Sequence, residues 1–138
     1  DKDTAMRIAR AQNTAMTCIP EFVQRAALAA LKDEESARRN VKIIGERLKI
    51  LYEELSKSEL IKVKPPEGAM YIFPKIRISG FDSWKFAWKL LEEKGVAVAP
   101  GASFGEDYND HLRISAVLSE KPLREACRRI REALEEIS

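Results

Sequence analysis

Residues 96–115 read VAVAPGASFGEDYNDHLRIS, and they predict two short strands joined by a polar loop. The apolar run 96–99 has the length of a strand. Pro100-Gly101 is expected to end it, because proline has no amide donor and glycine tolerates positive φ. In the second predicted strand, residues 111–115, alternation places Leu112 and Ile114 on one face. A small sheet with one apolar face follows from this pattern.

Arg113 lies on the opposite face of that second strand, together with Ser115. A guanidinium group is always charged, and its planar fork suits carboxylates and phosphates. Arg113 is therefore a candidate for anion binding. A structural ion pair or a solvated strand face would explain the same pattern, and the residues alone leave these alternatives open.

The rest of the chain alternates between helical and strand patterns. It predicts helices in residues 1–15 and after Pro20, a long helix over 33–56, strands at 60–64 and 69–73, a helix from residue 84 to Gly95, and a final helix after Ser119. This order indicates an α+β fold, a small sheet of about four strands flanked by helices on one face and preceded by a long linking helix.

Spacing also predicts which side chains face the core. In the helix from residue 84 the buried face is expected to contain Trp84, Ala87, Trp88 and Leu91. The spacing of the two tryptophans indicates packing in the core or at a domain interface rather than a ligand platform. In residues 69–73, Tyr71 and Phe73 share one face, and Phe73 is expected to form a wall of the core. The apolar residues of the long helix fit either a coiled-coil seam or, as we favour, a core stripe.

Composition excludes several classes of function. The chain has 138 residues, with 24 basic and 22 acidic side chains and a net charge of +2. Both signs are interleaved, which argues against nucleic acid or a membrane surface as the partner. A single histidine and two distant cysteines, Cys18 and Cys127, indicate reduced core thiols rather than a zinc site or a disulfide. The sequence has no signal peptide and no long apolar run, so we expect a cytoplasmic protein.

Three segments resemble the C-terminal small domain of fold-type-I, class I and II pyridoxal-phosphate aminotransferases, the aspartate-aminotransferase-like enzymes. They are PEGAMYIFP at 66–74, GVAVAPGASFG at 95–105 and LRIS at 112–115, in the family's order. The match extends upstream through TCIPEFVQRAA at 17–27. The resemblance therefore covers nearly the whole chain.

The resemblance implies a division of the chain and two site residues. Residues 1–32 would be a helical remnant of the large, cofactor-binding domain, and residues 33–138 the small domain. Arg113 would hold the substrate α-carboxylate, and Tyr71 would approach the substrate. The lysine that forms the Schiff base with the cofactor would lie upstream, so no catalytic or cofactor-binding residue is expected in this chain.

The resemblance also implies the partners. The full-length enzyme would carry pyridoxal 5′-phosphate, form a homodimer and act on an amino acid and a 2-oxoacid, while this chain alone would be inactive. The alternatives are another fold-type-I enzyme, such as a carbon–sulfur lyase or an amino-acid synthase, and a non-catalytic ferredoxin-like binding module. A sequence around the upstream lysine would distinguish the enzymes.

Overall fold

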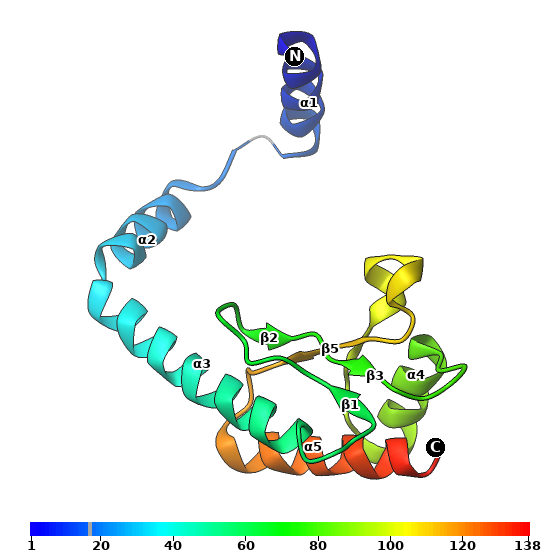
Figure 1. Cartoon of the computed structure of the whole chain (residues 1–138). Helices are drawn as coiled ribbons and strands as arrows, with labels where there is room; N and C mark the ends of the chain where they lie inside the picture. Colours follow the sequence, from blue (N-terminus) through cyan, green and yellow to red (C-terminus); the bar gives the residue numbers. More distant parts are fainter. Residues whose placement is uncertain (17) are drawn as a thin grey trace. The chain divides into compact units, whose positions relative to one another are not determined.

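A computed structural model describes residues 1–16 and 18–138 (Figure 1). Thr17, the first residue of the upstream matching segment, lies outside the described residues. The chain divides into two compact units, Asp1–Arg39 and Asn40–Ser138. The elements of the described part are, in order, α1 (Lys2–Ala15), α2 (Glu21–Lys32), α3 (Glu34–Leu55), β1 (Ile61–Lys62), β2 (Tyr71–Ile72), β3 (Lys75–Ile76), α4 (Ser83–Lys94), β4 (Ala99–Pro100), the 3₁₀ turns η1 (Gly101–Phe104) and η2 (Glu106–Tyr108), β5 (Leu112–Ser115) and α5 (Glu120–Glu135).

The first unit consists of α1, α2 and the start of α3. Asp1 caps α1, since its Oδ1 accepts a hydrogen bond from the amide of Thr4 at 2.8 Å. Pro20 stands at the N-cap position of α2. Neither α1 nor α2 buries a residue, so the helices form as predicted but their apolar stripes remain exposed.

The strands of the second unit form an antiparallel arrangement around β5. The three-stranded sheet has the order β2-β5-β4, in which Ile72 pairs with Ile114 and Ala99 pairs with Arg113. Strands β1 and β3 form a separate pair, which a bridge between Lys75 and His111 connects to the start of β5. The predicted α+β class is confirmed, with five short strands where about four were expected.

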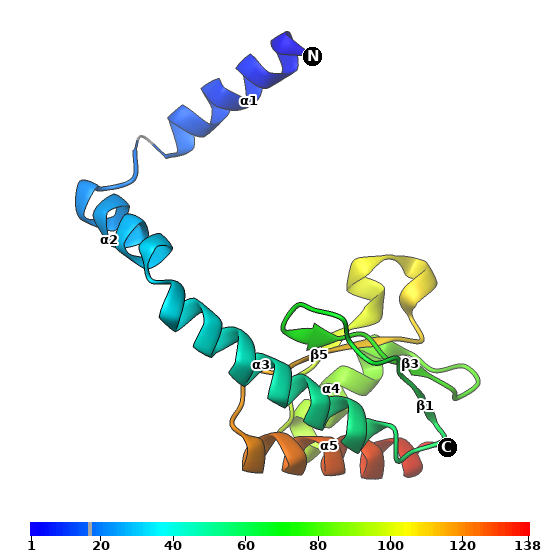
Figure 2. The ribbon, with the colours of Figure 1, turned by 60° about the vertical axis from the view of Figure 1, so that its left-hand side comes forward.

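One face of these strands carries the core. Helix α5 runs beneath the strands, alongside the second half of α3 (Figures 1 and 2). The core gathers apolar side chains from the strands, from α3, α4 and α5, and from the segments between them, among them Leu51, Leu55, Ile72, Ile76, Leu90, Leu112, Ile114, Leu123, Cys127, Ile130 and Leu134. The long helix therefore uses its C-terminal half as a core stripe, as favoured over a coiled-coil seam.

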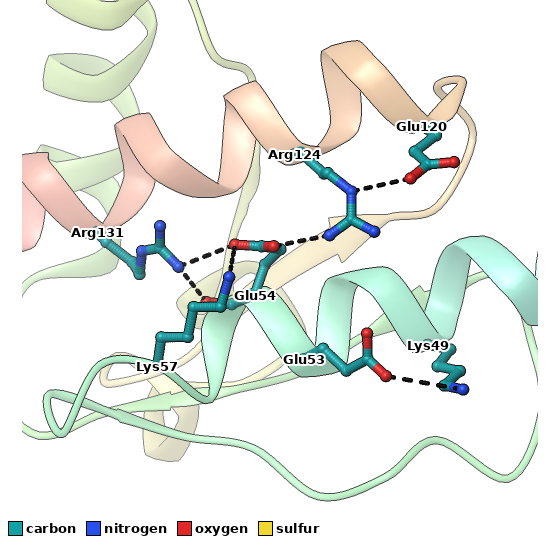
Figure 3. A network of polar contacts seen from close by, with 7 residues as sticks. All are labelled: Lys49, Glu53, Glu54, Lys57, Glu120, Arg124 and Arg131. Carbon is teal, nitrogen blue, oxygen red and sulfur yellow. Dashed lines mark hydrogen bonds and ion pairs between the residues drawn. The ribbon is translucent and has the colours of Figure 1, made fainter.

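A polar network fastens α3 to α5 at the edge of this core (Figure 3). The side chain of Glu54 is only 10% exposed, and its carboxylate accepts hydrogen bonds from Lys57 at 2.7 Å, from Arg124 at 2.7 Å and from Arg131 at 3.1 Å. Arg124 also contacts Glu120, which precedes it by one helical turn. The buried charge on α3 is thus neutralised by two arginines of α5 and by Lys57, which follows the end of α3.

The predicted buried face of α4 is confirmed for Ala87 and wrong for its three larger residues. Trp84, Trp88 and Leu91 are 49%, 58% and 42% exposed, while Phe86 and Leu90 are buried. Helix α4 has apolar side chains on two adjacent faces, and a polar contact selects between them. Ser83 begins the buried face, and its amide and hydroxyl both donate to Asn109 Oδ1.

Two further expectations need correction. Phe73 is 37% exposed rather than a wall of the core, because it shares the face of Tyr71 opposite the buried Ile72. The strand predicted at 96–99 is confined to Ala99–Pro100, so Pro100 is its last residue rather than the residue that follows it. Because β4 is an edge strand, a residue without an amide donor is tolerated there.

Candidate functional site

The candidate site is the face of β5 opposite the core. Leu112 and Ile114 are buried, while Arg113 and Ser115 alternate with them on the other side. Tyr71 pairs with Ser115 across the strands, which makes it the diagonal neighbour of Arg113 on the same face. The antiparallel register therefore brings together both residues proposed from the sequence.

The guanidinium of Arg113 lies against two aromatic rings. Its central carbon is 5.5 Å from the ring centroid of Tyr71 and 5.2 Å from that of Phe104. Both distances fall within the range of a cation–π contact, which is attractive because the ring face is electron-rich. The rings hold the charged group without occupying its hydrogen-bond donors.

The donors of Arg113 lack an acidic partner in the described part of the chain. Its Nε is buried and makes no hydrogen bond there, and no carboxylate of residues 1–16 or 18–138 forms an ion pair with it. A buried donor without an acceptor costs free energy that an incoming oxygen would recover. Of the alternatives that the sequence left open, an ion pair within the described residues therefore does not account for Arg113.

Phe104 reaches Arg113 because a tight turn follows β4. The amide of Gly101 donates to the carbonyl of His111 at 2.9 Å. A Cβ atom on Gly101 would lie only 2.1 Å from the carbonyl oxygen of Tyr108, so the turn requires glycine at this position. The amide of Ala102 donates to Ser83 Oγ at 3.2 Å, which connects the turn to the start of α4.

Phe104 packs against a cluster of aromatic rings. Phe73 contacts Phe104 edge-on at 5.6 Å between centroids, contacts Tyr108 at 5.5 Å, and stacks on His111 at 5.0 Å. Aromatic pairs in such geometry stabilise each other beyond the area they bury. The ring that faces Arg113 is thus itself held in place.

An ion pair lies beside His111, at the end of this cluster away from Phe104. Lys75 Nζ lies 2.6 Å from Asp110, whose other oxygen lies 2.5 Å from His111 Nδ1. The hydrogen bond from Lys75 is the main cause that lowers the pKa of Asp110, with His111 contributing further. Next to the site lies a hollow of about 430 Å³, which is bordered by Lys75, Tyr71, Phe73 and His111.

The sequence identified Arg113 and Tyr71 as site residues, but it gave Phe73 only a place in the core and assigned no role to Phe104. Phe104 was visible in the segment GVAVAPGASFG, yet nothing in its spacing shows that a 3₁₀ turn brings it back over β5. Phe73 becomes recognisable only once the register of the strands is known. In the register in which Tyr71 pairs with Ser115, position 73 falls opposite Arg113.

The described residues offer no metal site. Among them no three His, Cys, Asp or Glu side chains are close enough to hold an ion. Both cysteines are free. Cys127 is buried, and burial raises the pKa of its thiol to about 11. Cys18 is exposed, which corrects the expectation of a core thiol.

No helix in the described part is both long enough and apolar enough to cross a membrane.

Comparison with known proteins identifies the family of this α+β chain. The family model of class I and II aminotransferases matches residues 2–130. The chain is 42% identical over 120 residues to an aspartate aminotransferase of Pyrococcus horikoshii, covering 85% of this chain and 31% of that protein. The chain belongs to the class I and II aminotransferase family.

Solved structures agree with the sequence comparison. An aromatic aminotransferase from Pyrococcus horikoshii superimposes with a TM-score of 0.82 at 36% identity, covering 96% of this chain and 36% of that one. An aspartate aminotransferase from Thermotoga maritima gives a TM-score of 0.76 at 35% identity, covering 98% and 34%. The chain thus spans about a third of the length of the relatives it matches.

Proposed function

We propose that this chain is the substrate-anchoring part of a pyridoxal-phosphate-dependent aminotransferase, which transfers an amino group between an amino acid and a 2-oxoacid. The observation that carries the proposal is Arg113, held between Tyr71 and Phe104 with a buried, unpartnered Nε. Membership of the aminotransferase family supports the reaction class.

In this proposal Arg113 binds the substrate α-carboxylate. A guanidinium donates two parallel hydrogen bonds to one carboxylate, which fixes both the position and the rotation of the bound molecule. Holding the substrate in one orientation lowers the barrier chiefly by removing entropy that the reaction would otherwise lose. Tyr71 contacts the same guanidinium and would border the bound substrate.

The described residues do not fit the cofactor itself. A pyridoxal phosphate enzyme needs a lysine to form the imine, and the lysine beside this site, Lys75, is paired with Asp110 at 2.6 Å. No residue of this chain is therefore assigned to the cofactor. In the complete enzyme the cofactor would supply the electron sink, and this chain would supply the orientation of the substrate.

We propose the same domain division as the sequence indicated, with residues 1–32 belonging to the large domain and residues 33–138 to the small domain. The apolar side chains of α2, such as Phe22 and Leu31, are exposed and would pack on the large domain. Closure of the small domain on the large one would exclude water from the substrate. A homodimer in the cytoplasm remains the prediction for the complete enzyme.

The test is Arg113→Lys in the complete enzyme. Lysine keeps the charge but loses the planar fork, and a charge-assisted hydrogen bond contributes about 1.5–3 kcal/mol. We expect kcat/KM to fall at least about tenfold, since ~1.4 kcal/mol corresponds to a factor of ten. The loss should be similar for every amino acid tested, because all carry the same carboxylate.

The matched control is Arg77→Lys, at an exposed arginine of the same unit. It should leave kcat/KM unchanged. If Arg113→Lys instead lowers the melting temperature and leaves kcat/KM intact, Arg113 has a structural role and the proposal fails. Elimination without amino transfer by the wild-type enzyme would point to the lyase alternative.

A further inference from the structure

Helix α4 carries a second apolar face that the core does not use. Trp84, Trp88 and Leu91 follow one another at helical spacing on the surface, and all three are more than 40% exposed. The core contacts of α4 are already made by Phe86 and Leu90. Large aromatic side chains exposed in a continuous stripe are typical of interaction surfaces.

The stripe continues onto the segment that leads into β4. Ala97, Val98 and Pro100 lie beside it, and together with the helix they enclose a shallow hollow of about 150 Å³. A cavity of about that volume accepts a benzene-sized ring. The α4 surface, defined as Trp84, Trp88, Leu91, Ala97 and Val98, therefore presents aromatic rings and also a place for an aromatic ring, at whose floor the buried Ala87 and Pro100 lie. A surface with both features can bind a copy of itself.

Two charged residues flank the stripe in a pattern that selects an orientation. Lys85 and Glu92 are seven residues apart, so they lie on the same side of α4, about two turns from each other. Lys85 is 87% exposed and its only ion pair among the described residues is a long one, 3.9 Å to Asp82. Glu92 forms no ion pair with any described residue. Both charges remain available to a partner.

We propose that the α4 surface binds the α4 surface of a second copy of this chain, with the two helices antiparallel about a two-fold axis. In this arrangement Trp88, near the middle of the stripe, lies close to the axis. Lys85 of each copy then faces Glu92 of the other, which forms two equivalent ion pairs. In a parallel arrangement the equivalent flanks of the two helices would lie on opposite sides of the interface, so these ion pairs could not form. This inference does not depend on the proposed enzymatic activity.

The tryptophans themselves report on the contact, because Trp84 and Trp88 are the only two in the sequence. The 138-residue chain should dimerise in sedimentation experiments over the micromolar to millimolar range. Over the same range its tryptophan emission should move to shorter wavelength, and quenching by acrylamide should fall. Trp88→Gln should weaken dimerisation at least about tenfold, with the remaining Trp84 fluorescence no longer dependent on concentration.

Charge reversal tests the antiparallel orientation. Lys85→Glu alone and Glu92→Lys alone should each weaken dimerisation about threefold to tenfold, because each creates two like-charge contacts. An equimolar mixture of the two variants should dimerise as well as the wild type, since both contacts are then between opposite charges. The double variant Lys85→Glu/Glu92→Lys should also recover. Circular dichroism should show the same helix content for all of these surface variants.

The control uses the other exposed apolar surface of the chain. Phe22→Gln/Leu31→Gln changes α2 and should affect neither dimerisation nor the tryptophan signal. A chain that remains monomeric throughout the concentration range overturns the proposal. So does a dimer that the α2 variant abolishes and Trp88→Gln preserves. Two single charge variants that fail to recover when mixed rule out the antiparallel contact.

Discussion

At the scale of single residues, two aromatic rings fix the position of the Arg113 guanidinium without neutralising its charge. The rings of Tyr71 and Phe104 attract the guanidinium, by about 0.5–2 kcal/mol for each cation–π contact. A carboxylate in their place would also hold the group but would occupy the donors that a substrate needs. Two aromatic contacts therefore keep the arginine in position while its hydrogen-bonding edge stays available.

Gly101 determines whether Phe104 can make its contact, which leads to a prediction about stability. In Gly101→Ala the new methyl group would lie 2.1 Å from the carbonyl oxygen of Tyr108 and 2.5 Å from that of His111. Backbone atoms cannot move aside as a flexible side chain would, so we expect a loss of about 1–3 kcal/mol in the free energy of unfolding. Urea denaturation followed by circular dichroism measures this loss.

Gly45→Ala is the matched control for that substitution. Gly45 lies within α3, and a Cβ atom there would contact nothing within 4 Å. Alanine should therefore stabilise the chain by about 0.5–1 kcal/mol, because glycine is unfavourable inside a helix. Equal stabilities for Gly101→Ala and Gly45→Ala would mean that the turn opens freely and that the position of Phe104 is not fixed by it.

At the scale of elements, the contact between α3 and α5 is expected to depend on pH. The hydrogen bond from Lys57 is the largest cause that lowers the pKa of Glu54 from its ordinary value of 4.5. Hydrogen bonds from Arg124 and Arg131 lower it further. A carboxyl group whose pKa is lower in the folded state stabilises the fold above its unfolded pKa. This contribution is lost as the pH falls from about 4.5 through the lowered folded value.

Glu54→Gln tests this contribution directly. At neutral pH the variant should be less stable by about 1–3 kcal/mol, because Arg131 and Arg124 lose a charged acceptor on a carboxylate that is largely buried. The difference between the variant and the wild type should shrink as the pH falls below 4.5, where the wild-type carboxyl becomes protonated. Urea denaturation at a series of pH values measures it. A difference that stays constant with pH would exclude Glu54 as the titrating group.

Elements were predictable from the sequence where local signals agree, and less so where a distant contact decides. Gly95 ends α4 as expected, with φ 64°, and of the two residues able to cap the start of this helix, Asp82 and Ser83, Asp82 does so, since its Oδ1 accepts from two amides. The buried face of α4 was not predictable, because it depends on the hydrogen bonds between Ser83 and Asn109, 26 residues away. β3 was missed, because its two residues directly follow Pro74, just after the end of the strand predicted at 69–73.

The candidate site shows the same division. Arg113 was visible from alternation within one strand, and Tyr71 was identified through the resemblance to the family. Their proximity depends on the register between β2 and β5, which the sequence does not state. Phe104 lies nine residues from Arg113 along the chain, and only the turn at Gly101 brings the two together. The sequence therefore did not show which residues a turn or the strand register brings close together, and only the structure did.

At the scale of the whole molecule, the two units differ in how their helices are stabilised. The second unit has a core formed by strands and three helices. In the first unit, α1 and α2 have 14 and 12 residues and bury none of them. Isolated helices shorter than about 12–15 residues are marginal in water, so their stability must come from a surface that packs against them.

Hydrogen exchange of the 138-residue chain tests this difference, with α4 as an internal control. Helices α2 and α4 both have 12 residues, but only α4 buries side chains, among them Phe86 and Leu90. If packing rather than length stabilises these helices, the amides of α2 should exchange nearly as fast as those of an unfolded peptide. Those of α4 and β5 should exchange only through larger opening of the second unit. Exchange from α2 as slow as from α4, in a sample shown to be monomeric, would contradict this account, since no described residue of α2 is buried. In the complete enzyme, where we propose that the large domain covers α2, the same amides should become protected.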